Sequence, residues 1–154
     1  MRYFLDAEFN GFGGQLISLA LVPEDMAAES FYEALACPDP DTWVREHVTP
    51  VLQTRPISRR DMITRMATFF RADSEPLVIA DWPEDIAHFA TLMVTGPGYR
   101  IASPRFRFEL LSLPLFDSQT LSDLPHNALH DAIALRRYVL AEESWSHGRR
   151  VAAG

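Results

Sequence analysis

The sequence predicts a mixed α/β domain in which antiparallel strands come first and helices alternate with strands afterwards. Two observations predict this class. Three strand-like segments, separated by glycine and proline turns, lie between Arg2 and Leu35, and helical patterns then flank a short apolar run. With 154 residues, 47% hydrophobic and 23% charged, the chain has the size of one domain. We expect a single domain over residues 1–154, with 146–154 as a flexible tail.

The first strand is expected over Arg2–Glu8, where aromatic and aliphatic residues predominate. A glycine turn at Gly11–Gly14 leads into a second strand over Gln15–Val22, so the two predict a hairpin. The turn at Pro23–Asp25 precedes a third strand over Glu29–Leu35, which we expect to be antiparallel as well.

Helices follow the hairpin region. The segment Asp39–Asp41 offers a cap for a short helix within Thr42–Gln53, which Pro50 breaks. Ser58 is an N-cap candidate with Asp61 three residues later, a variant of the capping box. The helix that it begins has apolar side chains at helical spacing, namely Met62, Ile63, Met66, Phe69 and Phe70.

The second half contains a buried strand between helices. Leu77–Ala80 is wholly apolar and lies between turn signals, which is typical of a central strand. Pro83 begins a helix with an apolar pattern over Ile86–Val94, which Gly96–Gly98 ends. One more strand is expected over Phe106–Leu113, and a last helix runs from Asn127 to about Glu143.

Composition limits the function classes. The formal charge is −7 and all 14 basic residues are arginine, which by itself disfavours nucleic acid. Carboxylates that converge on divalent cations would offset this, because the cations supply positive charge locally. The one cysteine, Cys37, excludes an internal disulfide and a cysteine-rich zinc site. No apolar run is long enough to span a membrane and no secretory signal is present, so we expect a cytoplasmic protein.

Asp6 and Glu8 are the first candidate site residues. Two residues apart on a strand, their side chains leave the same face. Acids within an otherwise apolar strand are costly unless they are paired or bind a metal. The alternative is a chance match, and a second Asp-x-Glu does occur at Asp73–Glu75, although it lies in a polar break.

Asp81 and Asp85 follow the buried strand, Asp85 at the start of the next helix. Acids beyond the carboxyl end of a central strand are well placed for a site in an open α/β sheet. The alternative is structural, since Glu84 and Asp85 could simply stabilise the helix N-terminus through its dipole.

His126 and Asp131 flank the start of the last helix. If Asn127 caps that helix, its buried stripe consists of Ala128, Ala132, Leu135 and Val139. Asp131 borders this stripe, and His126 is free to fold back over whatever Asp131 holds. Histidine suits a general base because its pKa lies near working pH. The alternative is a surface histidine beside a helix-face aspartate, as we expect for His130.

Together these patterns resemble the DEDDh group of 3′-5′ exonucleases, in the ribonuclease H-like superfamily. Tyr3–Phe9 is similar to its first motif, Leu77–Asp85 to its second, with Asp85 in the metal-binding position, and Pro125–Ala132 to its third. The likeness extends to about residue 145 and includes small bacterial exoribonucleases. Asp81 stands where members usually have asparagine, and Glu84 where they have an aromatic residue, so Asp81 is an alternative ligand.

The resemblance implies a ribonuclease H-like mixed sheet flanked by helices and a two-metal phosphodiester hydrolysis. Asp6, Glu8, Asp85 and Asp131 would hold two divalent cations, Mg²⁺ or Mn²⁺, with Asp6 bridging both. His126 would take a proton from the attacking water. The expected substrate is the 3′ end of single-stranded RNA or DNA, with RNA preferred, and the product is a nucleoside 5′-monophosphate. Similar proteins are often homodimers.

Phe9 and Phe12 are expected to contact the terminal base of that substrate, because single strands are bound by aromatic stacking. The alternative is that both belong to the hairpin core. Two other functions remain open: a binding module that keeps the fold without hydrolysis, as the altered second motif suggests, and a nuclease of the same superfamily that cuts internally.

Overall fold

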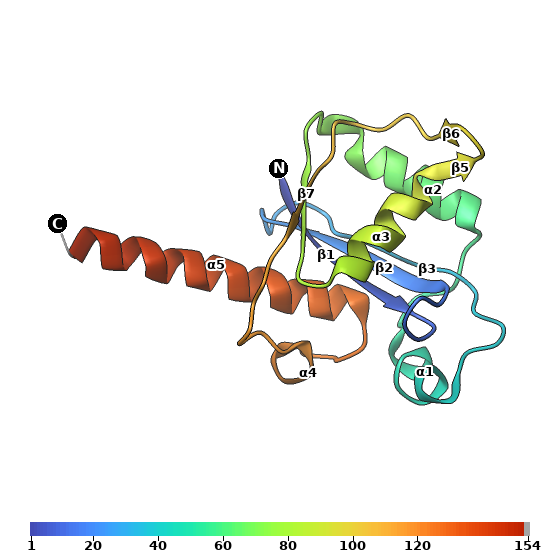
Figure 1. Cartoon of the computed structure of the whole chain (residues 1–154), viewed down its shortest axis with the longest axis horizontal. Coiled ribbons are helices and arrows are strands. Elements are labelled where there is room, and N and C mark those ends of the chain that lie inside the picture. The colour runs from blue at the N-terminus through green and yellow to red at the C-terminus, as the bar shows by residue number, and fades with distance from the viewer. Residues whose placement is uncertain (153–154) are drawn as a thin grey trace.

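The computed structural model describes the backbone of residues 1–152 and the side chains of residues 1–146. It is an α/β fold, with a five-stranded mixed sheet that has helices on both faces (Figure 1). The strand order is β3-β2-β1-β4-β7. The predicted class, a mixed sheet with antiparallel N-terminal strands and flanking helices, is confirmed.

The N-terminal strands form an antiparallel meander. β1 (Arg2–Phe9) pairs with β2 (Leu16–Pro23), and β2 pairs with β3 (Phe31–Ala34). The predicted hairpin is therefore confirmed, and its tight turn has Gly13 at a φ of 71°, a conformation that favours glycine. β3 is shorter than the range expected for it.

Two parallel strands complete the sheet. β4 (Leu77–Ala80) pairs with β1, with Ile79 opposite Phe4, and β7 (Arg107–Leu110) pairs with β4. β4 is central and mostly buried, as its wholly apolar sequence predicts. β7 is an edge strand that covers only part of the predicted range Phe106–Leu113.

The short helices begin where their caps predict. α1 (Thr42–His47) is capped by the Asp41 carboxylate, which accepts from the Val44 N–H at 3.1 Å, and a 3-10 turn at Thr49–Val51 follows. α2 (Arg59–Phe69) is capped by Ser58 and leads into a 3-10 turn at Phe70–Ala72.

The later elements differ more from the expectation. α3 (Pro83–Leu92) ends two residues early, and Val94, expected in the helix, instead begins a small hairpin of β5 (Val94–Gly96) and β6 (Tyr99–Arg100). Gly98 turns this hairpin at a φ of 75°. α4 (Ser118–Leu121) was not predicted.

The last helix, α5 (Ala128–Ala152), extends past the predicted end at Glu143. The range expected to be a tail, 146–154, is thus helical as far as Ala152, and residues 153–154 lie outside the described residues. Within residues 1–152, no helix combines the length and the apolar character needed to cross a membrane.

Successive side chains of β1 point to opposite faces of the sheet, so β1 contributes to the hydrophobic core on both faces. Tyr3 and Leu5 pack with α2 and α3, whereas Phe4 packs with Leu135 and Val139 of α5. In Figure 1, α5 covers one face and α2 and α3 the other. Because Asp6 and Glu8 alternate in step with Phe4, their side chains lie on the α5 face. This register positions the candidate site.

Candidate metal centre

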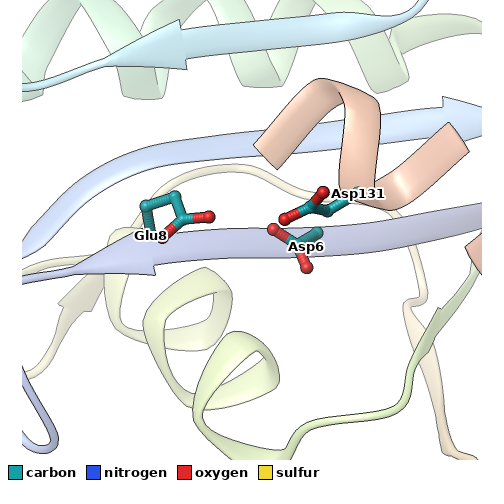
Figure 2. A group of neighbouring side chains, drawn as sticks. All are labelled: Asp6, Glu8 and Asp131. Carbon is teal, nitrogen blue, oxygen red and sulfur yellow. The ribbon is translucent and has the colours of Figure 1, made fainter. Parts of the chain in front are cut away.

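Three carboxylates from distant parts of the chain meet between β1 and α5. One oxygen from each of Asp6, Glu8 and Asp131 lies within 4.8 Å of the others. Figure 2 shows Asp6 and Glu8 projecting from the strand toward Asp131 on the first turns of the helix. Acids separated by more than 120 positions in the sequence therefore occupy one small volume.

Asn127 fixes the start of α5 and so the position of Asp131. Its side-chain oxygen accepts from the Leu129 N–H at 3.0 Å and from the His130 N–H at 3.3 Å. Its amide donates to the Val51 carbonyl at 2.6 Å, which anchors the helix end to the 3-10 turn. The predicted cap is confirmed, and so is the buried stripe Ala128, Ala132, Leu135 and Val139. Asp131 is 4% exposed on the inward side.

Asp81 and Asp85 reach the same region from the end of β4. β4 ends at Ala80 and pairs with β1 only as far as Phe4. The later residues of β1, up to Phe9, therefore have no β4 residue beside them. The Asp85 carboxylate accepts a hydrogen bond from the Ala7 N–H and is 2% exposed. Asp85 does not belong to the group within 4.8 Å, but it lines the same cleft.

The cleft has a volume of about 240 Å³. Its walls carry all five candidate acids, the candidate base and three other aromatic side chains. The lining residues are Asp6, Ala7, Glu8, Phe9, Asp81, Trp82, Asp85, Phe116, Ser118, His126 and Asp131. None of them is a lysine or arginine, so no lining side chain offers a permanent positive charge to the carboxylates.

Burial raises the pKa of every acid in the cleft, and repulsion between carboxylates raises it further for four of them, Asp6, Glu8, Asp85 and Asp131. Burial, with the nearby Asp85 and Glu8 charges, raises the pKa of Asp6 well above its ordinary value. Burial and Asp131 raise the pKa of Glu8 to about 8. Burial and Asp81 raise the pKa of Asp85 to about 9. Burial raises the pKa of Asp131 to about 6, although Ser122 and the His126 N–H oppose this by hydrogen bonding. Charging the site without a counter-cation is therefore unfavourable.

The donor set fits a hard divalent cation. Asp6 Oδ2 and Asp131 Oδ1 are buried and have no hydrogen-bond partner among the residues whose side chains the structure describes. Buried carboxylate oxygens are normally satisfied, and a cation held by both would satisfy them. All the ligands on offer are oxygen atoms, which suits Mg²⁺ or Mn²⁺ better than zinc.

His126 lies at the rim of the cleft in a strained backbone conformation. Its φ is 65°, which is uncommon for a residue other than glycine, and its N–H donates to Asp131 Oδ2 at 3.1 Å. Its ring meets the Trp43 ring edge-on at 4.8 Å, and Trp43 stacks on His47 at 4.7 Å. Burial and the neighbouring His47 lower the pKa of His126, which favours the neutral imidazole. His130, by contrast, does not line the cleft.

A second pocket adjoins the cleft and shares Glu8 and Phe9 with it. Its volume is about 450 Å³, and Phe12, Trp43 and Gln119 also line it. Phe12 is 85% exposed, so the alternative that it belongs to the hairpin core is wrong. Phe9 is half-buried and packs against the His88 ring at 5.0 Å.

Several residues of the two pockets were not singled out from the sequence. Trp43, Trp82, Phe116, Ser118 and Gln119 come from α1, the β4–α3 junction and the segment around α4. One signal was available: Trp43 is a large aromatic residue among charged neighbours on a short helix, where Val44 alone is buried. The α4 residues had no such signal, because their position depends on how a long connection folds back.

The second Asp-x-Glu match has a structural role. Asp73 Oδ2 accepts from the N-terminal ammonium at 2.7 Å and from the Tyr3 hydroxyl at 3.2 Å. It thereby holds the beginning of β1 and lies outside both pockets. The two Asp-x-Glu matches therefore differ in their structural surroundings: Asp6 and Glu8 line the cleft, whereas Asp73 holds the chain terminus.

Comparison with models of known protein families gives no match, and comparison with curated proteins gives none either. The function is therefore inferred from the site's own geometry and chemistry.

Proposed function

We propose that this protein is a metal-dependent 3′-5′ exonuclease of the DEDDh type, acting on the 3′ end of single-stranded RNA or DNA, with RNA preferred. It would release nucleoside 5′-monophosphates. The proposal includes a ribonuclease H-like fold, with which the strand order β3-β2-β1-β4-β7 and the antiparallel first three strands are compatible.

One observation carries the proposal: the carboxylates of buried Asp131 and half-buried Asp6 and Glu8 converge to within 4.8 Å at a cleft without a basic lining side chain. Two of their oxygens are buried and have no hydrogen-bond partner among the residues whose side chains the structure describes. A structural ion-pair network would contain a cation of its own, and this one does not. Clustered acids with raised pKa values are typical of sites that bind divalent cations or transfer protons.

Each residue of the site has a distinct task in the proposed reaction. Asp6, Glu8 and Asp131 would hold the cations, and Asp85 would complete the set from the opposite wall of the cleft. When bound, two divalent cations stabilise the charge that develops on the attacking and leaving oxygens of the phosphodiester. His126, neutral and at the rim, would accept the proton of the attacking water.

The adjoining pocket supports recognition of a chain end. Phe9 and Phe12 offer aromatic faces beside Glu8, where the terminal base would stack while its phosphate lies over the carboxylates. Trp43 lines this pocket and also contacts His126. The same side chain would therefore contact the bound base and position the proton acceptor.

The test is trimming of a 5′-labelled single-stranded RNA oligonucleotide with and without Mg²⁺ or Mn²⁺. The expected result is a ladder shortened from the 3′ end, with release of mononucleotides only when the cation is present. Asp6→Asn should abolish the trimming and His126→Ala should slow it by about 10²–10⁴-fold, while circular dichroism shows the fold retained. Affinity for the oligonucleotide without release would favour a binding module, and cleavage of a circular single strand would favour internal cutting.

A further inference from the structure

A half-buried tyrosine ties the segment after α1 to the sheet. Tyr32, on β3, packs against a cluster that includes Ala128 and Ala132 of α5. Its hydroxyl donates to the Leu52 carbonyl at 2.5 Å, and Leu52 directly follows the 3-10 turn that succeeds α1. Burial raises the pKa of Tyr32 to about 12, so the hydroxyl keeps its proton and remains a donor at neutral pH.

The start of α5 is tied to the same end of that turn. The Asn127 side-chain amide donates to the Val51 carbonyl at 2.6 Å and, at 3.4 Å, to the Leu52 carbonyl. Tyr32 and Asn127 thus converge on two consecutive carbonyls and join β3, the 3-10 turn and α5. His126, which lines the cleft, is the residue directly before Asn127.

Backbone strain occurs on both sides of this junction. Among the residues whose backbone the structure describes, Gln53 and His126 are the only two other than glycine at positive φ, with values of 51° and 65°. Gln53 follows Leu52, and His126 precedes Asn127. Such conformations persist where the surrounding contacts hold them, and they cluster at functional sites. The hydrogen bonds at Leu52 and Asn127 are contacts of this kind.

The contacts form a closed ring that includes the imidazole. Trp43 lies on α1, which leads directly into the 3-10 turn, and the Trp43 ring meets the His126 ring at 4.8 Å. His126 is joined to Asn127 along the chain, and Asn127 returns to the turn. Movement of the turn would therefore move Trp43 and change the surface against which His126 packs. Tyr32 attaches this ring to the sheet, from which the proposed cation ligands of β1 also project.

We propose that Tyr32 is a positioning residue for His126: its hydroxyl fixes the turn after α1 and thereby holds Trp43 against the imidazole. This inference rests on the proposed function, because it takes His126 as the proton acceptor. Tyr32 lines neither the cleft nor the adjoining pocket, so it acts through Trp43 rather than on the substrate. A small displacement of a reacting group is enough to lower a rate strongly.

Tyr32→Phe tests the proposal, because it removes the hydroxyl and keeps the ring. In the trimming of labelled RNA with Mg²⁺, kcat should fall about tenfold or more, and KM should change less than about threefold. In the His126→Ala background the same substitution should have no further effect, since the group that it positions is absent. A merely structural loss would lower the rate by the same factor in both backgrounds.

Tyr3→Phe is the matched control. Tyr3 is a second tyrosine of the same sheet, and its hydroxyl donates to Asp73 at 3.2 Å on the face that packs with α2 and α3. This variant also loses one side-chain hydrogen bond, but on the side of the sheet away from the candidate metal centre. It should leave kcat and KM unchanged, and circular dichroism should show both variants folded.

A measurement without substrate shows whether the hydroxyl holds Trp43. The indole N–H signals of ¹⁵N-labelled protein are assigned by replacing each tryptophan with phenylalanine; the tryptophans are Trp43, Trp82 and Trp145. Tyr32→Phe should shift the Trp43 signal and leave the Trp145 signal in place, whereas Tyr3→Phe should shift neither.

The outcomes separate this inference from the proposed function. A wild type that trims no RNA would overturn the proposed function and with it the role of His126. In an active wild type, a Trp43 signal that Tyr32→Phe leaves unmoved would overturn the positioning role alone. Equal losses of rate with and without His126 would do the same.

Discussion

The backbone N–H of His126 donates to the Asp131 carboxylate across 3.1 Å. The proposed proton acceptor, two residues before α5 begins, is thus joined directly to a proposed cation ligand in the first turn of that helix. The left-handed conformation of His126 makes this possible, since it turns the chain so that both the N–H and the ring face the cleft.

Replacing His126 by alanine should lower the rate of 3′ trimming by about 10²–10⁴-fold, the range for loss of a general base. The backbone hydrogen bond to Asp131 stays available, so binding of Mn²⁺, followed by calorimetry, should change little. His130→Ala is the control, because His130 lies nearby on α5 but outside the cleft, and its loss should leave the rate unchanged. Equal rates for wild type and His126→Ala would remove His126 from the mechanism.

The metal-free protein should become less stable as the pH rises above about 7. Burial raises the pKa of Glu8 to about 8 and that of Asp85 to about 9, both well above their ordinary values. Across this range the folded chain binds more protons than the unfolded chain, so its free energy of unfolding falls with pH, by on the order of 1–3 kcal/mol. Histidines with lowered pKa values act in the opposite sense, but below this range.

Urea unfolding in the presence of a chelator, repeated between pH 7 and about 9, measures the slope of the free energy of unfolding against pH. Asp85→Asn should flatten it, because the amide cannot be charged. A saturating divalent cation should reverse the loss in the wild type by binding the ionised acids. A slope that is the same in the variant and the wild type would contradict the assignment of the effect to this cleft.

Asp6→Asn should stabilise the metal-free protein and abolish its response to metal. Asp6 Oδ2 is buried without a hydrogen-bond partner among the described residues, and four other carboxylates raise its pKa. The neutral amide removes this repulsion, so the metal-free melting temperature should rise by several degrees. Mn²⁺ should then raise the melting temperature of the wild type only. A variant that still gains stability from Mn²⁺ would show that Asp6 is not a ligand.

The sequence was sufficient to predict elements with strong local signals. Ser58 and Asp41 cap the helices expected of them, and the wholly apolar run Leu77–Ala80 is the central strand. The placement of Asp6 and Glu8 on one face followed from the two-residue period of a strand. That they meet Asp131 in space is a property of the sheet order, which no local pattern contains.

The errors arose where tertiary contacts override local preference. Val94 continues an apolar helical pattern, yet the chain leaves the helix at Leu92, because the glycine turn at Gly98 allows a hairpin to form. α4 occurs in a connection of low periodicity and was not foreseen. The pockets include side chains from this connection, so their aromatic lining could be recognised only once the chain path was known.

Asp85, rather than Asp81, should be the acid on which the reaction depends. Asp85 is almost fully buried, and its charge is the largest carboxylate influence on the pKa of Asp6, whereas that of Asp81 is the smallest of the four. Asp85→Asn should reduce trimming on the order of 100-fold or more, and Asp81→Asn by less than about tenfold. Single-turnover rates at saturating Mg²⁺ measure both. The opposite order of effects would identify Asp81 as the ligand from this junction.

Phe12→Ala should weaken substrate binding with little effect on the chemical step. Phe12 is exposed at the tip of the β1–β2 hairpin, where it lines the pocket beside Glu8 and lies 6.1 Å from the Trp82 ring. Stacking of a base on an aromatic side chain contributes about 1–3 kcal/mol, so KM should rise about tenfold while kcat changes little. The fold should be unaffected, because the side chain has few neighbours to lose.

Met26→Ala is the matched control for Phe12→Ala. Met26 is another large exposed apolar residue in a turn of the N-terminal meander, and it lines neither pocket. Its removal should leave both kcat and KM unchanged. If Phe12→Ala also left KM unchanged, the terminal base could not rest on this ring, and recognition of the chain end would fall to Phe9 and Trp43 on the inner wall of the same pocket.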